Sequence, residues 1–488
     1  MRVYVTFLLM LFGVAFQGEA AHEIRTFCNP MSLENYPIGL PCRGYKNGDE
    51  TGGNLAWKTP EHRVVQFREM ADPTILCEKG VWYLYPSGDL CYRSDDCGAT
   101  WKHIPLHLSG ADGEEDLIGY APTVCRHRGK VLLLGSAAHI FEGETPEGPF
   151  KDLGILVLPR TAGMGLCDPN LFSDDDGRLY FYWGCSPTNG IWGLELDAQN
   201  PCKVISEAKK LINFEPQKHP WEVLEGSNPP IGYLEGPWML KHNGKYILTY
   251  AAGGTENRGY AMGQVVGDRP LGPFVKTKNN PFYRKTEGFV VGTSHGSVTK
   301  GPDGNYWVAY TINANRVHFF ERRIGMDRIE FDADGTLKVS FATEEPQWLP
   351  AFGQGPTGWK RLPAVPQAGA EAATDLHLNT IWKTEKLPAV LTLDLGAERT
   401  LYAVRIAWYD CGLNTECGVK KGPYQYRLES RAQDGSWKTL LDASKNTRDL
   451  LIDYRETEPT KAKAVRLVVL GAPRGILPGI ADCSLFGK

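Results

Sequence analysis

The sequence contains 488 residues, which is too long for one ordinary domain and enough for two or three. Its formal net charge is only −4, so bulk charge gives no support for a nucleic-acid or anionic-membrane partner. The 54 glycines, 33 prolines, 13 tryptophans, 21 tyrosines and 19 phenylalanines are typical of a globular all-β protein with many tight turns. This composition excludes a coiled coil, a collagen and a disordered scaffold.

The first residues have the pattern of a secretory signal peptide. Met1 and Arg2 form a basic start, an apolar run covers residues 3–16, and the small residues Ala20 and Ala21 follow. We expect cleavage after Ala20, or alternatively after Ala21, and export to the periplasm or the extracellular space. No later run of 18 apolar residues occurs, so we expect no membrane insertion. The sequence has no Asn-x-Ser/Thr site, which favours a bacterial exported protein.

Twelve cysteines are present, and nine of them lie between Cys28 and Cys202. An exported protein can form disulfides, but the sequence alone leaves the pairing open. No CxxC pair or Cys/His cluster has the spacing of a zinc site. The cysteine spacing therefore predicts no zinc site.

One pattern occurs five times between residues 72 and 310. Each copy has a first residue that is mostly polar, usually followed by Pro or Gly, then an apolar stretch, a turn containing Gly, and a strand rich in aromatic or apolar residues. The copies start at Asp72, Ala121, Asp168, Glu235 and His295. Asn-Gly and Asp-Gly pairs between apolar strands are typical of β-hairpins. One hairpin with its neighbours every ~50 residues is the size of a propeller blade.

The repeats predict an all-β fold that begins with a five-bladed β-propeller over residues 21–352. The innermost strand of each propeller blade faces the central axis. We therefore expect the first residues of the five copies to point into one shared funnel, although they are far apart in sequence.

A second all-β unit is predicted after a linker. Residues 353–372 are rich in Gly, Pro and Ala, and we expect them to separate two folding units only loosely. Beyond them, short alternating strands such as 391–396, 404–408 and 424–430 predict a β-sandwich over residues 373–488.

Three of the five axial positions carry a carboxyl group: Asp72, Asp168 and Glu235. Each alone could be a turn residue, since Asp-Pro and Glu-Gly-Pro are common in turns. Their shared position in a repeat favours a functional role. Two carboxyl groups across a sugar-sized funnel suit glycoside hydrolysis, in which one protonates the leaving oxygen and the other deprotonates water.

Five short motifs follow one another in a fixed order: Ala71-Asp72-Pro73, Tyr120-Ala121-Pro122, Asp168-Pro169-Asn170-Leu171-Phe172, Glu235-Gly236-Pro237 and His295-Gly296-Ser297. Together they resemble glycoside hydrolase family 43, in clan F, over residues 28–343. The family usually has Trp-Ala-Pro where this chain has Tyr-Ala-Pro. The resemblance implies a five-bladed propeller and an inverting mechanism. It further implies that Asp72 is the general base, Glu235 the general acid, and Asp168 the residue that orients the acid and raises its pKa.

The resemblance also implies that His295 lies near the axis, in contact with water, a calcium or another ion. A structural His that caps the channel is the alternative. We expect no required cofactor, with calcium near the propeller axis as an open possibility. The acidic run Asp174–Asp176 suits a hairpin turn better than a calcium loop, because it lacks the spacing of an EF-hand.

Four further residues are candidates for sugar binding. Arg322 matches an Arg-bearing strand of the family, and a surface pair with Arg323 is the alternative. Trp183, Trp221 and Trp238 lie close to axial motifs and could stack on a sugar ring. Buried tryptophans usually belong to the core, which is the alternative for each of them.

The C-terminal unit resembles the discoidin-like, coagulation-factor type C sandwich. The resemblance rests on Leu393-Asp394-Leu395-Gly396, Asp434-Gly435-Ser436-Trp437 and Val465-Arg466-Leu467. These are framework residues, so they indicate a fold and not a ligand. Sugar binding and simple packing against the propeller both stay open.

The sequence therefore favours a secreted, exo-acting, inverting glycosidase that acts on side chains of plant cell-wall polysaccharides, most specifically an α-L-arabinofuranosidase. We expect a monomer whose partner is an oligo- or polysaccharide. The alternatives are β-xylosidase, galactofuranosidase or galactanase activity on the same scaffold, and a carbohydrate-binding propeller without catalysis. A sialidase is disfavoured, because residues 94–101 form the only Asp-box. Specificity lies in the loops between blades, which leaves the sugar open.

Overall fold

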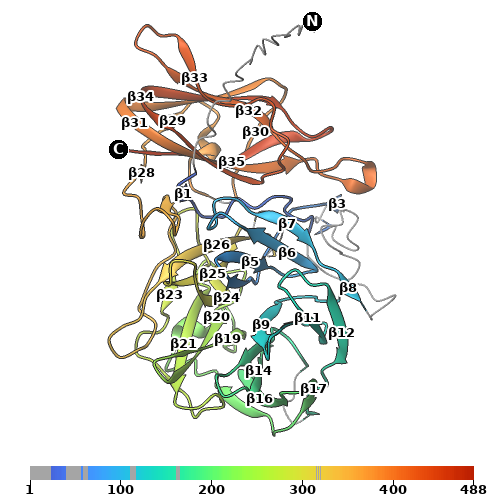
Figure 1. The fold of residues 1–488 in the computed structure, drawn as a ribbon. Coiled ribbons are helices and arrows are strands. Elements are labelled where there is room, and N and C mark those ends of the chain that lie inside the picture. The colour runs from blue at the N-terminus through green and yellow to red at the C-terminus, as the bar shows by residue number, and fades with distance from the viewer. Residues whose placement is uncertain are drawn as a thin grey trace, which may run out of the picture.

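The computed structural model describes residues 24–39, 57–58, 64–109, 117–160, 165–314, 316, 318, 320–377 and 379–488. The predicted signal peptide, residues 1–20, lies outside the described residues. The described chain forms a β-propeller and a C-terminal β-sandwich that packs against one side of it (Figure 1). No helix within these ranges is long and apolar enough to cross a membrane.

The propeller has the five blades that the repeats predict. Blade one consists of β4 (Thr74–Glu78), β5 (Val81–Tyr85), β6 (Leu90–Ser94) and β7 (Lys102–Pro105). Blade two consists of β9 (Thr123–His127), β10 (Lys130–Leu134), β11 (His139–Gly143) and β12 (Phe150–Ile155), with β8 (Leu108–Ser109) at its edge. Blade three consists of β13 (Asn170–Ser173), β14 (Leu179–Trp183), β16 (Ile191–Asp197), β17 (Asn200–Val204) and β18 (Lys209–Ile212).

Blade four begins with a strand that comes from the neighbouring repeat. It consists of β15 (Cys185–Ser186), β19 (Leu234–His242), β20 (Lys245–Ala252), β21 (Ala261–Gly267), β22 (Val275–Lys276) and β23 (Tyr283–Arg284). The short helix η2 (Pro220–Glu222) lies in the long connection before β19. Blade five consists of β24 (Ser294–Lys300), β25 (Tyr306–Asn313) and β26 (Arg322–Ile329).

The innermost strands form a closed ring. They contact one another in the cyclic order β4, β9, β13, β19, β24 and again β4. Every inner strand begins close to one of the five predicted axial residues, so the first residue of each repeat lies at the start of an inner strand. The sequence prediction of a five-bladed propeller is confirmed.

A belt of hydrogen bonds joins each inner strand to the next. The bonds run from Thr74 Oγ1 to Pro122 O (2.6 Å), from Leu171 N to Thr123 Oγ1 (3.0 Å), from Met239 N to Asn170 Oδ1 (2.9 Å), from Trp238 Nε1 to Val298 O (2.9 Å) and from Ile75 N to Ser297 Oγ (2.8 Å). The five side chains involved occupy the same place in the repeat. One such bond contributes only about 0.5–1.5 kcal/mol, but the complete belt fixes the position of every blade around the axis.

The chain segment before blade one closes the ring at blade five. Met31 N donates to the carbonyl of Ile324 on β26 (2.8 Å), and Met326 N donates to Asn29 Oδ1 (2.9 Å). Strand β1 (Thr26–Phe27) pairs with β27 (Gln347–Trp348), just before the sandwich. A second short pair, β2 (Trp57–Lys58) with β3 (Val64–Val65), also precedes blade one. The first and last blades are therefore held together by hydrogen bonds between this segment and β26.

The sandwich is built around two long, bent strands. Its hydrogen-bonded order is β28 (Lys360–Arg361), β35 (Leu477–Gly487), β31 (Ala389–Cys411), β34 (Ile452–Gly471), β32 (Gln425–Arg431) and β33 (Trp437–Ala443). Strand β29 (Val365–Pro366) pairs with β31, and β30 (Trp382–Lys383) pairs with β35. The short helices η3 (Glu371–Ala373) and η4 (Thr415–Cys417) lie in its connections.

The predicted linker, residues 353–372, is part of the sandwich. Strands β28 and β29 lie within it and pair with β35 and β31, and Leu362 is buried in the core. Edge strands of two residues need few apolar side chains, so their sequence resembles a linker. The prediction that this segment separates two loosely associated units is wrong.

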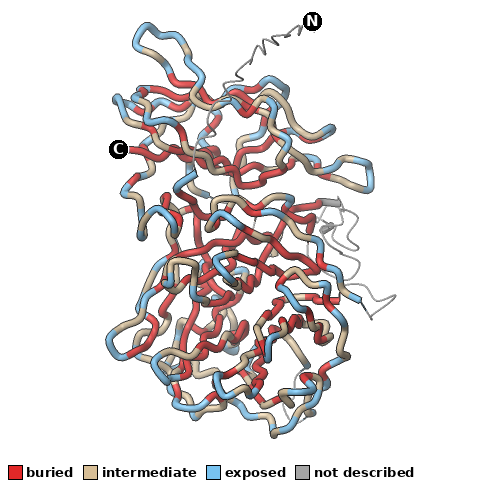
Figure 2. The backbone as a smooth tube through the Cα atoms, viewed as in Figure 1, coloured by how far each residue is buried: buried red, intermediate tan, exposed pale blue. Residues whose placement is uncertain are grey.

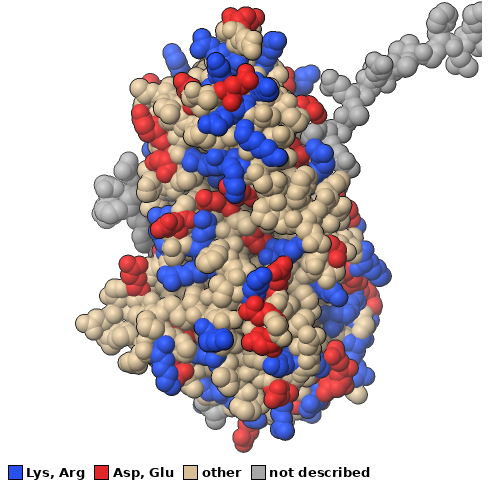
Figure 3. All heavy atoms as spheres, turned by 90° about the vertical axis from the view of Figure 1, so that its left-hand side faces the viewer, with Lys and Arg blue, Asp and Glu red and all other residues tan. Residues whose placement is uncertain are grey.

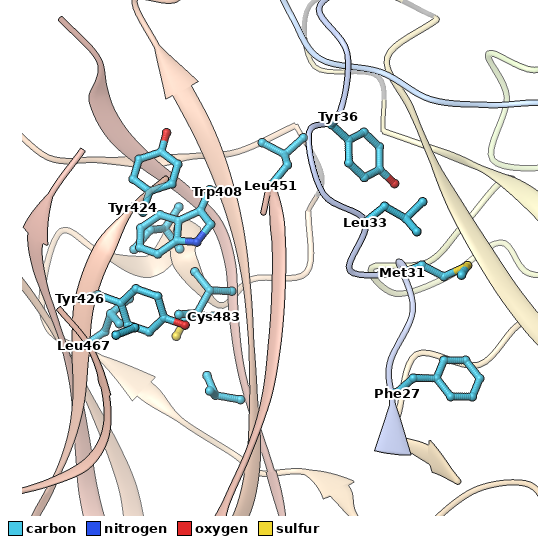
Figure 4. Packing of buried hydrophobic residues seen from close by; sticks show 14 of the residues in the cluster. Phe27, Met31, Leu33, Tyr36, Trp408, Tyr424, Tyr426, Leu451, Leu467 and Cys483 are labelled. Carbon is cyan, nitrogen blue, oxygen red and sulfur yellow. The ribbon is translucent and has the colours of Figure 1, made fainter. Parts of the chain in front are cut away.

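One hydrophobic cluster crosses from the propeller into the sandwich. In Figure 4, Phe27, Met31 and Leu33 lie on the segment between the two units, and Trp408 and Tyr426 lie on the sandwich strands. The same cluster includes residues of blades one and five. Figure 2 shows buried chain continuing through this interface. The two units therefore share one core.

Two buried arginines hold the interface. Arg68, before blade one, donates to Asp449 Oδ1 (2.9 Å) and Oδ2 (2.8 Å) and to Asp410 Oδ2 (3.1 Å) of the sandwich. Arg405, on β31, donates to the carbonyls of Asn29 (2.6 Å) and Glu344 (3.2 Å). Its charge is balanced by Asp482, at 3.0 Å. On the side of the molecule that Figure 3 shows, acidic and basic side chains are interspersed, in keeping with the small net charge.

We expect Arg405→Met to lower the free energy of unfolding by about 3–5 kcal/mol, because it leaves the buried carboxylate of Asp482 without its cation. Denaturant unfolding followed by tryptophan fluorescence measures this change. Lys461→Met is the matched control, since Lys461 and Glu398 form an exposed ion pair at 3.8 Å. Such pairs contribute at most about 1 kcal/mol. Equal losses in the two variants would contradict the role assigned to Arg405.

Candidate functional site

A residue with a left-handed backbone stands just before each inner strand or among its first three residues. These residues have φ between +41° and +54°, and they are Asp72, Ala121, Asp168, Gly236 and His295. Residues other than glycine rarely adopt this conformation, and a residue before proline is normally extended. Such strain persists only where the surrounding structure enforces it, and it is concentrated at functional sites. The five blades therefore share one strained turn, which directs side chains towards the axis.

The axial residues of four blades converge on the ring of His295. Its Nδ1 lies 3.2 Å from Asp72 Oδ1 and 3.8 Å from Asp168 Oδ2. The ring also packs on Gly236, because a Cβ at that position would lie 2.5 Å from His295 Cδ2. Gly236 N donates to Asp168 Oδ2 at 3.2 Å, and Glu235 is the preceding residue. The structure thus brings together the three carboxyl groups and the histidine that the repeat singled out.

Asp72 is the carboxyl group with a cationic partner. Arg322 Nη1 donates to its two oxygens at 3.1 and 3.3 Å, and Ser87 Oγ donates to Oδ2 at 2.8 Å. Burial by itself raises the pKa of Asp72, but the charges of Arg322 and His295 and hydrogen bonds from Ser87 and Thr311 outweigh it. The net shift of the pKa is downward, so Asp72 is a carboxylate at neutral pH.

Glu235 is in a different environment. It is buried, Tyr260 donates its hydroxyl to Oε1, and the Cys185 thiol donates to Oε2 at 3.1 Å. Burial raises the pKa of Glu235 to about 7, the charge of Asp72 adds to the rise, and the two hydrogen bonds and Arg322 oppose it. Glu235 therefore retains its proton over the acidic range and up to neutrality.

The pKa of Asp168 is raised as well. Burial raises it well above the usual range, the charges of Cys167, Glu235 and Asp72 add to the rise, and the hydrogen bond from the Gly236 N–H opposes it. We expected a charged Asp168 to raise the pKa of Glu235. Burial is instead the main cause for both groups, and the carboxylate that adds to the rise at Glu235 is Asp72.

Arg322 is a positioning residue in this arrangement. It is buried on β26 and bridges Asp72 and Glu69, with its Nε at 3.4 Å from Glu69 Oε2. Its Nη2 is buried and has no hydrogen-bond partner among the described residues. The surface pair that the sequence left open as an alternative is therefore wrong, because Arg322 and Arg323 are both buried.

The three candidate tryptophans have different positions. Trp183 has no exposed surface and lies between Phe181 (5.4 Å between ring centroids) and Trp192 (6.5 Å) in a blade core. Trp238 belongs to the belt between blades, where its Nε1 donates to β24. Trp183 therefore offers no ring face to a sugar, and the sugar-stacking interpretation is wrong for it. Trp238 is half-buried, and sugar contact by its ring stays a prediction. Trp221 is half-buried.

Trp221 lies on η2, next to the segment that carries Tyr260. A Cβ placed on Gly253 would contact both the Trp221 carbonyl (3.3 Å) and Tyr260 Cα (3.7 Å). Tyr260 in turn donates to the acid, Glu235. Trp221, like Trp238, therefore stays a candidate for contact with a sugar.

Two possible calcium sites were considered from the sequence, His295 and the acidic run Asp174–Asp176. His295 faces two carboxyl groups, but the one group of three closely spaced donors among the described residues is Cys167, Asp168 and Cys185. Calcium at His295 stays a prediction. Asp174 accepts hydrogen bonds from Lys241 Nζ (2.7 Å) and Asp175 N (2.8 Å) in the turn between β13 and β14. The acidic run therefore forms the hairpin turn that its spacing favoured.

The comparisons with known proteins agree with this geometry. The model of glycosyl hydrolases family 43 matches residues 62–337 of the chain.

The chain belongs to glycosyl hydrolases family 43.

This membership makes the protein an enzyme of an inverting glycoside hydrolase family. The model of a NedA-like, galactose-binding domain matches residues 372–467, in agreement with the predicted discoidin-like sandwich. The chain is 32% identical over 196 residues to Beta-D-galactofuranosidase xynD of Aspergillus niger, which covers 39% of this chain and about half (51%) of that protein. It is 26% identical over 326 residues to Beta-xylosidase of Xylanibacter ruminicola, which covers 55% of this chain and 96% of that protein. The crystal structure of a thermostable family-43 glycoside hydrolase is similar with a TM-score of 0.51 and 25% identity, covering 67% of this chain and 99% of that one.

Several residues around the family 43 site were not predicted from the sequence. They are Glu69, Ser87, Cys185, Tyr260 and Thr311, which contact Asp72, Glu235 or Arg322. None of them stands at the repeated axial position. Cys185 reaches Glu235 because β15 leaves its own repeat and pairs with β19, with Cys185 opposite Glu235. No local pattern reveals such a pairing between repeats.

We expect Gly236→Ala to reduce kcat/KM at least tenfold, because the new methyl group would collide with the His295 ring at 2.5 Å. Gly244→Ala is the matched control in the same blade. Gly244 also has a positive φ, +77°, so both substitutions add backbone strain of about 1 kcal/mol, but open space surrounds Gly244. Steady-state kinetics and thermal melting of both variants separate the collision from the strain. Equal activities in the two variants would refute the packing of His295 on Gly236 as a requirement.

Proposed function

We propose that this enzyme is an exo-acting α-L-arabinofuranosidase that removes side chains from plant cell-wall polysaccharides with inversion of configuration. In this proposal Asp72 is the general base, Glu235 the general acid and Asp168 a positioning residue. The observation that carries it is the different surroundings of two buried carboxyl groups at one site. Arg322 donates to both oxygens of Asp72, whereas Glu235 accepts hydrogen bonds from Tyr260 and Cys185. The pKa of Asp72 is therefore lowered, with Arg322 the strongest of the groups that lower it, whereas burial raises the pKa of Glu235 to about 7.

Inversion needs these two protonation states at the same time. The base must be charged to take a proton from water, and the acid must be neutral to give one to the leaving oxygen. Arg322 and Ser87 donate hydrogen bonds to the carboxylate of Asp72. On the acid's side, Asp168 accepts the N–H of Gly236 and so fixes the backbone beside Glu235. Asp168 thus acts through the acid and not on the sugar.

The choice of sugar is supported by the relatives. One is named a β-D-galactofuranosidase, which acts on a five-membered ring, and another a β-xylosidase, which acts on a five-carbon sugar. α-L-Arabinofuranose has the five-membered ring of the first and the five carbons of the second. Galactofuranosidase and β-xylosidase activities are the alternatives that these names favour. Trp221 and Arg322 are the side chains we assign to sugar contact, and we expect a monomer.

We expect Glu235→Gln to abolish hydrolysis of arabino-oligosaccharides while keeping part of the activity on nitrophenyl arabinofuranoside. A nitrophenolate leaves with little protonation, whereas a sugar alkoxide needs the acid. Asp72→Asn should lose at least a hundredfold on both substrates, because no water is activated in either case. A panel of nitrophenyl furanosides and pyranosides, with kcat/KM for each, identifies the sugar.

Proton NMR of the first product gives the stereochemistry, and inverted configuration is expected. Retention of configuration, or near-normal activity of Asp72→Asn, would overturn the assignment of roles. Binding of oligosaccharides without turnover of any glycoside in the panel would instead favour a carbohydrate-binding propeller.

We expect kcat/KM on arabino-oligosaccharides to fall as the pH rises through about 7, because Glu235 then loses the proton it must donate. Arg322→Met should move both limbs of the profile to higher pH. Arg322 lowers the pKa of Asp72 and also that of Glu235, so its removal weakens the opposition to burial at both groups. Arg328→Met is the control, since Arg328 stands on the same strand but pairs with Asp303. Unshifted limbs in Arg322→Met would contradict this electrostatic account.

A further inference from the structure

Two cysteines that are far apart in sequence lie beside the proposed acid. Gly184 N donates to the carbonyl of Cys167 at 3.0 Å, so the backbones that carry Cys167 and Cys185 run next to each other. Cys185 is also the strand partner of Glu235 in the pairing of β15 with β19. Backbone hydrogen bonds, and not flexible loops, therefore place both thiols at this point.

The thiols form a compact donor group with Asp168. The Sγ atoms of Cys167 and Cys185 and a carboxyl oxygen of Asp168 all lie within 4.8 Å of one another. Cys167 Sγ is 3.6 Å from Asp168 Oδ1, and Cys185 Sγ is 3.1 Å from Glu235 Oε2. In a tetrahedral zinc site with Zn–S bonds of about 2.3 Å and Zn–O bonds of about 2.0–2.2 Å, neighbouring donors are about 3.3–3.8 Å apart. The distance of 3.6 Å between Cys167 Sγ and Asp168 Oδ1 falls in this range, and the other two donor separations are no longer than 4.8 Å.

The chemistry of the group selects the class of cation. Two thiolates and a carboxylate favour a soft or borderline ion such as Zn²⁺ or Cd²⁺ over Ca²⁺ or Mg²⁺, which take oxygen ligands. Cys167 and Cys185 are only half-buried, whereas Asp168 is buried behind them. An ion can therefore reach the thiols without unfolding of the blade.

We propose that Cys167, Asp168 and Cys185 form a binding site for a thiophilic divalent cation such as Zn²⁺, and that an ion bound there inhibits the enzyme. The inhibition rests on the function proposed above for Glu235 and Asp168. On binding, the two thiols and the Asp168 carboxyl release their protons to solvent, and metal bonds form to two sulfurs and one oxygen. The fourth position accepts water or Glu235 Oε2.

Binding of the ion interferes with catalysis in two ways. The thiolate of Cys185 can no longer donate a hydrogen bond to Glu235, and the bound ion stands next to this acid. Asp168, which accepts the N–H of Gly236 beside Glu235, becomes an ionised metal ligand. Since Asp168 and Glu235 both belong to the proposed catalytic centre, we expect the bound ion to lower kcat and removal of the ion to restore it.

The test uses the full chain, reduced and then freed of reductant, with Co²⁺ as a spectroscopic probe and Zn²⁺ as the inhibitor. We expect a thiolate-to-cobalt charge-transfer absorption with one Co²⁺ per chain, which Zn²⁺ removes by competition. One equivalent of Zn²⁺ should lower kcat at least tenfold, and EDTA should restore it. Cys167→Ala and Cys185→Ala should each lose the absorption and the inhibition. Cys202→Ala, a half-buried cysteine on β17 of blade three, should keep both.

Thiol alkylation gives a second measurement on the unmodified sequence, in case a cysteine variant does not fold. Zn²⁺ should protect Cys167 and Cys185 from iodoacetamide, as mapped by mass spectrometry, and should leave the exposed Cys417 reactive. Absence of the absorption in the wild type, its persistence in both alanine variants, or a Cys167–Cys185 disulfide that survives reduction would overturn the site. Cobalt binding through both cysteines without loss of hydrolysis would overturn the inhibition. A chain that binds cobalt but hydrolyses no glycoside would contradict the proposed function and leave the site standing.

Discussion

The guanidinium of Arg322 determines which buried carboxyl group at the propeller axis carries a charge. Burial raises the pKa of every carboxyl group there, so a site made of carboxyl groups alone would be neutral and could not activate water. Arg322 contacts both oxygens of Asp72 and reverses the shift at that one residue. The charge on Asp72 then adds to the rise at Glu235, so one ion pair creates the base and helps to keep the acid protonated.

This ion pair crosses the seam where the propeller closes. Asp72 precedes blade one, whereas Arg322 begins the last strand of blade five. Met70 N donates to the carbonyl of Arg322 at 3.2 Å, and Arg323 Nη1 donates to the carbonyl of Arg68 at 2.7 Å. The contacts that close the ring therefore also bring Arg322 next to Asp72. An open ring would separate the base from the cation that ionises it.

The repeat made much of this predictable from the sequence. Asp-Pro and Glu-Gly-Pro motifs before Gly-containing hairpins are local features, and the symmetry of a propeller turns their shared position into a common site. The turns share one left-handed residue, which is the axial residue itself at Asp72, Asp168 and His295 and the following residue, Gly236, in the motif of Glu235. Asp72, Asp168, Glu235 and His295 could be assigned to one site in this way.

The remaining residues depend on contacts that no local pattern contains. Trp238 stands two residues after the left-handed Gly236, at the place where the other blades have the polar residues that link neighbouring strands. Its aromatic side chain suggested a sugar platform, but the position in the repeat gives it the same linking role. Trp183 is in a strand buried on both faces, where aromatic residues fill the core on either side. Residues 353–372 have a linker composition because strands of two residues at a sheet edge need little apolar surface.

The sandwich is connected to the active site through a short segment before blade one. Arg68 is bound by Asp449 and Asp410 of the sandwich, and the next residue, Glu69, contacts Arg322. Arg322 in turn holds Asp72, three residues further along the same segment. The ion pairs of Arg68 with Asp410 and Asp449 are buried, so the position of Arg68 depends on the sandwich as well as on the propeller. The sandwich therefore supports the geometry around the base, and this role is independent of any sugar that the sandwich itself binds.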